Sequence, residues 1–315
     1  MKLWKASFAL LLTVLASSSQ AAEKLTIGTG GTGGVYHVLG EGIAKLLSQK
    51  IPDVQITAQS TGASVDNLLF IRSNKVDMGL SMADAAWDAL QGEGKFKNEK
   101  VNVRVLAALY ANYMHVVTLE RNGISVLANL GGKRVSTGSP GSGTEVTAVR
   151  LLELAGVDKT VVRERLGVAE SVEALKNGNI DAFFWVSGIP APAVTGLAAA
   201  LGTQIKFIDH AEWVSEMNKK YVPLYSKGVL AADSYPNQRK PVNSLLVWNL
   251  LVVDAKMNDE LAYKITQTLM ENQPELIKAH KEAVHISIKN QGATSPIPYH
   301  PGAKRYFKEK GITVQ

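Results

Sequence analysis

Residues 25–36 read LTIGTGGTGGVY and carry the strongest fold signal in the chain. A short apolar strand, Leu25 to Ile27, leads into five glycines and two threonines, and a helical pattern of apolar residues begins at Val35. Strand, glycine turn and helix together can hold an anion, because glycines let the backbone approach a ligand and the first helical N–H groups lack intrahelical partners. A dinucleotide phosphate and a carboxylate can both use such a site.

The dinucleotide interpretation fails a second requirement. The spacing G-x-G-x-x-G at 28–33 fits the dinucleotide fingerprint, which also asks for an acidic residue at the end of the second strand. The second predicted strand, 54–58, ends in Gln-Ser-Thr at 59–61, and Asp53 stands at its start instead. We therefore favour a carboxylate site over a nucleotide site. A tight turn without any ligand remains the alternative.

The first 21 residues have the pattern of a secretory signal peptide. Lys2 and Lys5 precede an apolar run at 8–15, and Ser-Gln-Ala at 19–21 forms a small-x-small cleavage site. The apolar run is too short to span a bilayer, which needs about 20 residues. We therefore expect cleavage before Ala22 and a periplasmic location for the exported chain.

Composition excludes several classes of function. The chain has no cysteine, which rules out a disulfide framework, cysteine-bound zinc and a thiol nucleophile. The six histidines are scattered without the spacing of a metal site, and no serine has a histidine and an acid placed as partners. Without the two signal-peptide lysines the formal net charge falls from +6 to +4 and is spread along the chain, which argues against a nucleic-acid partner. We expect a protein that is not an enzyme and uses no cofactor or metal.

Strands and helices alternate along the chain, which predicts an α/β fold with a mostly parallel sheet covered on both faces. The length of the mature chain favours two lobes over one core. Lobe one is predicted to comprise residues 22–112 and 241–315, and lobe two residues 113–240. The cleft between the lobes is the expected ligand site.

The chain is expected to cross between the lobes twice. The first crossing is placed near Asn112, between a strand at 103–110 and another at 116–119. The second leads into a long, almost entirely apolar strand, Val242 to Val253. Two crossing strands would form a hinge about which the lobes close on a ligand.

Three further segments are candidates for the walls of the cleft. STGAS at 60–64 offers hydroxyls and amides at a helix N-terminus, although Ser64 by itself is better explained as an ordinary N-cap. SPGSGT at 139–144 is the matching turn of lobe two, where Gly143 is expected to let the backbone approach a ligand. Glu145 is expected to serve the helix dipole. Trp185, at the end of a predicted strand, is interpreted as a wall that can stack on a ligand.

Five ordered segments make the mature chain similar to a known family of receptors. They are GTGGTGGVY (28–36), STGASVDNL (60–68), GGKRVSTGSPGSGTE (131–145), NGNIDAFFWVSGIP (177–190) and PIPYHPGAKRYFKEKG (296–311). On these segments the chain resembles the TAXI class of TRAP transporter solute receptors. The resemblance implies a two-lobed type II periplasmic binding fold and capture of a small organic acid or amino acid, often glutamate or a related dicarboxylate. It also implies delivery to a TRAP membrane permease driven by an ion gradient, and we expect a monomer.

The resemblance further implies which residues face the ligand. We expect its carboxylate to be held by backbone N–H groups and hydroxyls rather than by an arginine. His37 stands where the family often has a second tyrosine, and residues 222–225 replace a small-residue segment, so both positions bear on ligand choice. The expected ligand-binding residues are Gly31, Thr32, Gly33, Tyr36, Thr61, Ser64, Asn67, Ser139, Ser142, Gly143, Thr144, Trp185 and Ser187.

Other classes of protein share this fold or this export route. The receptor of an ATP-driven transporter differs in its membrane partner rather than in its pocket, and a sensor input domain needs a kinase or chemoreceptor. An exported hydrolase would turn its ligand over, whereas a receptor binds it near one to one and returns it unchanged.

Overall fold

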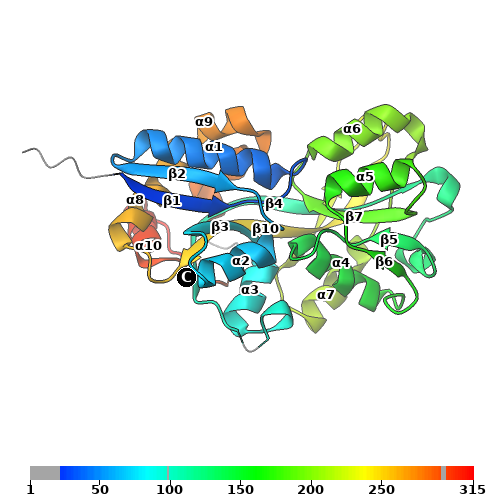
Figure 1. Cartoon of the computed structure of the whole chain (residues 1–315), viewed down its shortest axis with the longest axis horizontal. Coiled ribbons are helices and arrows are strands. Elements are labelled where there is room, and N and C mark those ends of the chain that lie inside the picture. The colour runs from blue at the N-terminus through cyan, green and yellow to red at the C-terminus, as the bar shows by residue number, and fades with distance from the viewer. Residues whose placement is uncertain (1–21, 98, 292–295) are drawn as a thin grey trace, which may run out of the picture.

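The computed structural model describes residues 22–97, 99–291 and 296–315. The predicted signal peptide, residues 1–21, lies outside the described residues. Within the described part, none of the helices combines the length and the apolar character that crossing a membrane requires. The chain forms two lobes that lie side by side, as Figure 1 shows.

Lobe one, on the left in Figure 1, is built from both ends of the chain. Its helices cover both faces of its part of the sheet, as predicted. Its elements are β1 (Glu23–Gly28), α1 (Val35–Lys50), β2 (Val54–Gln59), α2 (Ser64–Arg72), β3 (Met78–Met82), α3 (Ala83–Gln91), α8 (Asp259–Glu271), α9 (Gln273–Ala279) and α10 (Pro301–Glu309).

Lobe two, on the right in Figure 1, is built from the middle of the chain. Its helices α5 and α6 lie on one face of the sheet and α4 and α7 on the other. Its elements are β5 (Arg134–Ser136), α4 (Gly143–Leu154), β6 (Val162–Glu164), α5 (Val168–Lys176), β7 (Ala182–Ser187), α6 (Pro192–Leu201), β8 (Ile205–Phe207), α7 (Val214–Lys220) and β9 (Tyr225–Leu230).

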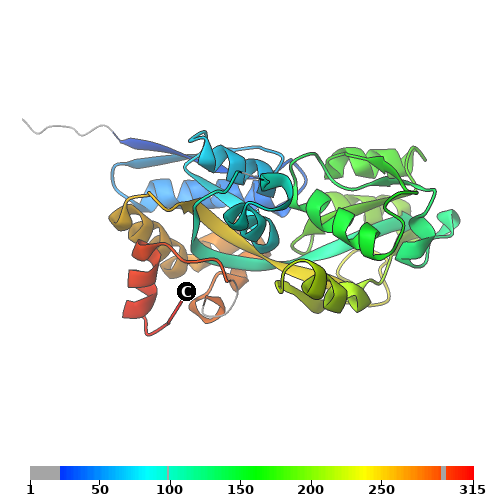
Figure 2. The same ribbon diagram turned by 90° about the horizontal axis from the view of Figure 1, so that it is seen from below.

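Two long strands join the lobes, β4 (Val103–Leu119) and β10 (Val242–Asp254). Both pass from one lobe into the other through the middle of the molecule in Figures 1 and 2, and they pair with each other in antiparallel fashion from Val103 opposite Asp254 to Tyr113 opposite Leu246. The first part of β10 pairs with β9 and the last part with β3. The predicted hinge of two crossing strands is therefore present, while the residue limits predicted for the lobes stay predictions.

The sheet differs from the prediction in two respects. Residues 103–110 and 116–119 belong to one continuous strand, β4, rather than to two strands with a crossing between them. The sheet is mixed rather than mostly parallel: strands within each lobe run parallel, but both joining strands run antiparallel to their neighbours. β10 returns the chain to lobe one and so runs opposite to β3 and β4, and β4 in turn runs opposite to β7 of lobe two.

The apolar runs of the joining strands are explained by burial. Nearly every residue of β4 and β10 is shielded from solvent, because helices cover the sheet on both faces. The strand order β2-β1-β3-β10-β4-β7-β5-β6 places both of them in the middle. A second cluster of buried side chains, including Phe183 and Leu197, lies in lobe two.

Candidate ligand-binding site

A cavity of about 130 Å³ lies where the two lobes meet. It is surrounded by the turns that follow β1, β2, β5 and β6, by the last residues of β3 and β7, and by part of β4. Turns after the carboxyl ends of strands gather at one cleft in α/β sheets, so the position follows from the topology. The lining residues are Gly30, Gly31, Thr32, Gly34, Val35, Tyr36, Gly62, Ala63, Ser64, Met82, Asn112, Ser139, Ser142, Gly143, Thr144, Gly167, Val168, Ala169, Glu170, Trp185, Val186 and Ser187.

Five helices begin at this cavity, three from lobe one and two from lobe two; one of them is α3, whose N-cap Met82 also lines it. The other four N-cap residues are Gly34 of α1, Ala63 of α2, Ser142 of α4 and Gly167 of α5, and all of them line it. A helix N-terminus carries a positive partial charge and N–H groups without intrahelical partners. The cavity is therefore suited to a negatively charged group that touches both lobes.

Some of these donors are used in direct contacts between the lobes. The carbonyl of Gly141 in lobe two accepts hydrogen bonds from the N–H groups of Val65 (3.0 Å) and Asp66 (3.1 Å) at the start of α2. On the other side of the cavity, the N–H of Ala193 in lobe two donates to the carbonyl of Gly33 at 3.3 Å. The lobes thus touch around the cavity, and the structure is a closed arrangement.

The indole of Trp185 forms part of the cavity wall and explains one glycine of the first turn. A Cβ atom at Gly34 would lie 2.9 Å from Cζ2 of Trp185, so only glycine lets this side chain of lobe two pack against the backbone of lobe one. Among the described residues, Nε1 of Trp185 has no hydrogen-bond partner. The wall therefore holds one unpaired donor.

A chain of polar side chains lies beneath the cavity at the crossing of the joining strands. The phenol of Tyr36 donates to Oδ1 of Asn249, and Nδ2 of Asn112 donates to the same oxygen at 2.7 Å. Nδ2 of Asn249 in turn donates to the carbonyl of Tyr110 at 3.3 Å. Burial raises the pKa of Tyr36 well above its usual range, so its hydroxyl stays a neutral donor. Within the described part of the chain, Oδ1 of Asn112 is an unpaired acceptor.

Charged side chains are scarce around the cavity. Glu170, in the first turn of α5, is the only acidic or basic residue among the described residues that line it. No arginine or lysine belongs to that set. A bound carboxylate would therefore meet N–H groups and hydroxyls, as the sequence predicts, although a liganded state is needed to test that prediction.

Ten of the thirteen predicted ligand-binding residues line the cavity, and three do not. Their roles in binding stay predictions, because position alone does not test them. Gly33, Thr61 and Asn67 lie outside the lining set. The lining residues are Gly31, Thr32, Tyr36, Ser64, Ser139, Ser142, Gly143, Thr144, Trp185 and Ser187.

Asn67 has a different set of partners from the one expected. Its side chain is completely buried, and its Nδ2 group donates to the carbonyls of Gly28, Thr29 and Leu80. Its Oδ1 atom accepts the hydroxyl of Thr61 at 2.7 Å. The amide therefore fastens the first glycine turn to β3, which accounts for its place in the sequence without a ligand.

One expectation about a helix start is wrong. The N-cap of α2 is Ala63, at φ 86°, and Ser64 is the first helical residue, whose Oγ accepts the N–H of Met82 at 3.1 Å. Glu145 lies in the first turn of α4, where it is expected to complement the helix dipole, and it also forms ion pairs. Its buried carboxylate lies 2.7 Å from Nε of Arg165 and 3.2 Å from Nη2 of Arg163.

Gly143 is close to protein atoms of the opposite lobe. A Cβ atom there would lie 2.4 Å from Sδ of Met82 and 2.8 Å from Oγ of Ser64, both in lobe one. Its backbone does not need a positive φ, in contrast to Gly138 and Gly141 of the same turn. The close approach predicted for this glycine is present, but its partner in the structure is lobe one.

Sequence reasoning missed Asn112 and the segment 167–170 of the cavity wall. Both left signals. Asn112 is a polar residue within a buried apolar strand, and a buried polar group usually has a specific partner. Residues 167–170 follow β6, so the rule that placed the other turns at the cleft applies to them as well.

The family of the chain is shown by a match over nearly its whole length. The model of the NMT1-like family matches residues 27–311. The chain belongs to the NMT1-like family. The TAXI class suggested by the five sequence segments is a finer assignment that this match leaves open.

Several solved structures are similar to this member of the NMT1-like family. An ancestral arginine-binding protein bound to arginine is 17% identical with a TM-score of 0.51, over 82% of this chain and 97% of that one. A putative L-cystine ABC transporter protein from Listeria monocytogenes is 17% identical with a TM-score of 0.52, over 83% and 95%. PhnD1 from Prochlorococcus marinus, in complex with methylphosphonate, is 12% identical with a TM-score of 0.54, over 82% and 89%. At such identities the likeness shows the fold, which is the one predicted.

Proposed function

We propose that this protein is an extracytoplasmic solute receptor that holds a small carboxylate in the cavity between its lobes. The observation that carries the proposal is the convergence of five helix N-termini, three from lobe one and two from lobe two, on one cavity without an arginine or lysine among its described lining residues. A ligand held from both sides favours the closed arrangement by its differential affinity. Binding and release of an unchanged solute, rather than catalysis, is what this arrangement supports.

An amino acid or a related dicarboxylate fits the polar groups around the cavity. The helix N-termini suit a carboxylate, while Glu170 and the unpaired Oδ1 of Asn112 suit an ammonium or hydroxyl group. Glutamate meets both requirements. The binding proteins for arginine and L-cystine that share the fold are consistent with an amino-acid ligand, and the methylphosphonate-bound one with an anion.

A thermal-shift screen followed by calorimetry tests the receptor function. The panel comprises L-glutamate, 2-oxoglutarate, succinate, L-arginine and methylphosphonate. We expect at least one carboxylate to bind near one to one and to be recovered unchanged from the complex. Turnover of the bound compound, or no stabilisation by any acid in the panel, would contradict the proposal.

For the membrane partner we favour an ATP-driven transporter, because structural neighbours such as the putative L-cystine protein belong to that class. A TRAP permease is the second candidate and rests on the five sequence segments that resemble TAXI receptors. Uptake of the labelled solute by cells separates the two. ATP depletion with arsenate should stop an ATP-driven system, whereas a protonophore or removal of sodium should stop a gradient-driven one. The predicted export and periplasmic location are part of both proposals.

A further inference from the structure

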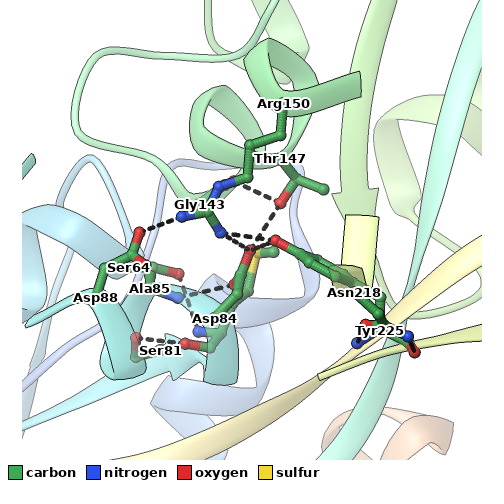
Figure 3. A network of polar contacts seen from close by, with 11 residues as sticks. Ser64, Ser81, Asp84, Ala85, Asp88, Gly143, Thr147, Arg150, Asn218 and Tyr225 are labelled. Atoms are coloured by element: carbon green, nitrogen blue, oxygen red, sulfur yellow. Dashed lines mark hydrogen bonds and ion pairs between the residues drawn. The ribbon is translucent and has the colours of Figure 1, made fainter. Parts of the chain in front are cut away.

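Beside the cavity, a cluster of buried charged and polar side chains joins the two lobes. Asp84 and Asp88 belong to α3 of lobe one, and Thr147 and Arg150 to α4 of lobe two. Tyr225, at the start of β9, also comes from lobe two. Figure 3 shows these side chains pointing toward one another.

The contacts in this cluster are short and shielded from water. Nη2 of Arg150 lies 2.6 Å from Oδ2 of Asp88, and Nη1 lies 3.6 Å from Oδ2 of Asp84. The hydroxyl of Tyr225 accepts a hydrogen bond from Nη1 of Arg150 at 2.7 Å and donates to Oδ2 of Asp84 at 2.8 Å. The arginine side chain is 11% exposed and the two carboxylates 0% and 4%. The hydroxyl of Thr147 lies 3.2 Å from the same oxygen of Asp84.

The contacts that the guanidinium and the two hydroxyls make with the carboxylates all cross between the lobes, while Oδ1 of Asp84 accepts the N–H of Ala85 within lobe one at 2.9 Å. Lobe one supplies both acids, and lobe two supplies the guanidinium and both hydroxyls. A second ion pair, between Lys95 of lobe one and the buried Glu145 of lobe two, crosses the same joint at 3.6 Å. The cluster is therefore complete only when α3 and α4 lie against each other.

Closing the cavity and completing the cluster are the same movement. Met82, which lines the cavity, is followed directly by α3, and Asp84 lies in the first turn of that helix. Ser142 and Gly143 line the cavity at the start of α4, and Arg150 lies on the same helix. Among the described lining residues, no member of the cluster is found, so it does not belong to the ligand site itself.

We propose that Arg150, together with Asp84 and Asp88, is a latch between the lobes that sets how tightly the solute is held without contacting it. The inference rests on the proposed receptor function only where ligand affinity is concerned. The apparent dissociation constant of a receptor rises as the population of its closed state falls. Residues that act only on that population therefore tune affinity from outside the site.

The physical reason is the cost of an unpaired buried charge. Replacing Arg150 by an uncharged residue leaves two carboxylates shielded from water in the closed arrangement, but free to hydrate once the lobes part. The open arrangement is thereby favoured. We expect the affinity for solute to fall by at least about tenfold, since removing one partner of a buried pair is among the larger single-residue effects.

Asp88 has further charged neighbours that bear on the latch. Burial raises its pKa to about 6 against the opposing effect of Arg150, and Asp84 and Glu93 add to the rise. An open cleft would hydrate Asp88 and return its pKa toward the usual value of about 3.9. The closed form therefore takes up a proton on Asp88 more readily than the open form.

The absence of cysteine from the chain allows a direct test of closure. Spin labels on Lys45→Cys in α1 and Asn177→Cys after α5, both exposed positions on opposite lobes, report the distance between the lobes. The distance between the two labels is measured by pulsed electron paramagnetic resonance without solute and with saturating L-glutamate. Calorimetry with L-glutamate gives the affinity.

Two variants remove the latch and two matched controls leave it intact. Arg150→Met removes the guanidinium, and Tyr225→Phe removes only the bridging hydroxyl. Arg134→Met breaks an ion pair of 2.8 Å within lobe two, and Tyr263→Phe breaks a hydrogen bond of 2.6 Å to Glu309 within lobe one. For Arg150→Met we expect longer interlobe distances without solute and at least about tenfold weaker binding of L-glutamate. Tyr225→Phe should change both quantities less, in the same direction. Both controls should keep the interlobe distances and the affinity of the parent.

The outcomes distinguish the latch from the receptor function. If Arg150→Met or, should that variant not fold, Tyr225→Phe keeps the interlobe distances of the parent, the latch does not exist. If the distances change as expected but the parent binds no L-glutamate, the latch stands and the proposed amino-acid ligand is wrong. Equal effects of the latch variants and the controls would show a general loss of stability and would also overturn the proposal.

Discussion

Replacing Gly143 by alanine should weaken solute binding by preventing full closure of the lobes. The new Cβ atom would lie 2.4 Å from Sδ of Met82 and 2.8 Å from Oγ of Ser64, whereas ordinary contacts begin at 3.4 Å. The overlaps amount to about 1 Å with the sulfur and about 0.6 Å with the hydroxyl. Met82 can turn its thioether away, but Ser64 is held in place by its bond to the N–H of Met82.

The size of the effect follows from the cost of overpacking. Extra atoms in a well-packed region cost about 1–3 kcal/mol, which corresponds to roughly 5–150-fold in the dissociation constant. Both overlapping atoms belong to lobe one while Gly143 belongs to lobe two. The cost therefore falls on the closed arrangement rather than on the folding of either lobe, so the melting temperature without solute should change little.

Calorimetry with the best solute from the screen measures the change, and circular dichroism shows that the variant is folded. Gly196→Ala is the matched control, because a Cβ atom at this position of α6 would meet no atom within 4 Å. We expect the control to bind as the parent does. A folded Gly143→Ala protein with the affinity of the parent would refute the reasoning and show that the lobes do not need this close approach.

Three other predictions follow from contacts described above. Solute binding should strengthen by up to about tenfold as the pH falls from 7 to 5, because the raised pKa of Asp88 makes the closed form take up a proton. Calorimetry at both pH values measures this change, and the Asp88→Asn substitution should abolish the pH dependence. Trp185→Ala should weaken binding by about tenfold through loss of the aromatic wall, whereas an unchanged dissociation constant would remove the indole from the site. Asn67→Ala should lower the free energy of unfolding by about 3 kcal/mol, since three backbone carbonyls lose their donor, with little change in affinity; urea denaturation and calorimetry together test the pair of expectations.

Periodicity and turn chemistry predicted most of the fold. The return strand predicted from Val242 to Val253 matches the structure almost residue for residue, because its apolar run is long and has clear ends. The continuous strand through Asn112 was not predictable in the same way. Polar residues interrupt its apolar run, and only pairing with β10 on one side and β7 on the other keeps it extended.

The candidate site could be located from the sequence more easily than its contacts could be assigned. Glycine turns after successive strands predicted which segments meet, and ten of the residues singled out line the cavity. The partners of Asn67 and Glu145 depend on which side chains the fold brings within reach, such as Thr61 and the arginines of β6 and the turn after it. No local pattern records such long-range pairings, so the sequence alone could not distinguish a structural amide from a ligand-binding one.

The position of β10 in the sheet has a consequence for how the chain matures. This strand lies between β3 and β4, yet it is made only after the whole of lobe two. During synthesis β3 and β4 therefore wait for a partner encoded near the end of the gene, and pairings between such distant segments form slowly. A nascent chain of this design cannot complete lobe one while it is still being translated. Slow completion of lobe one would suit the export route that the predicted signal peptide implies, because a translocation channel passes an extended thread and not a folded protein.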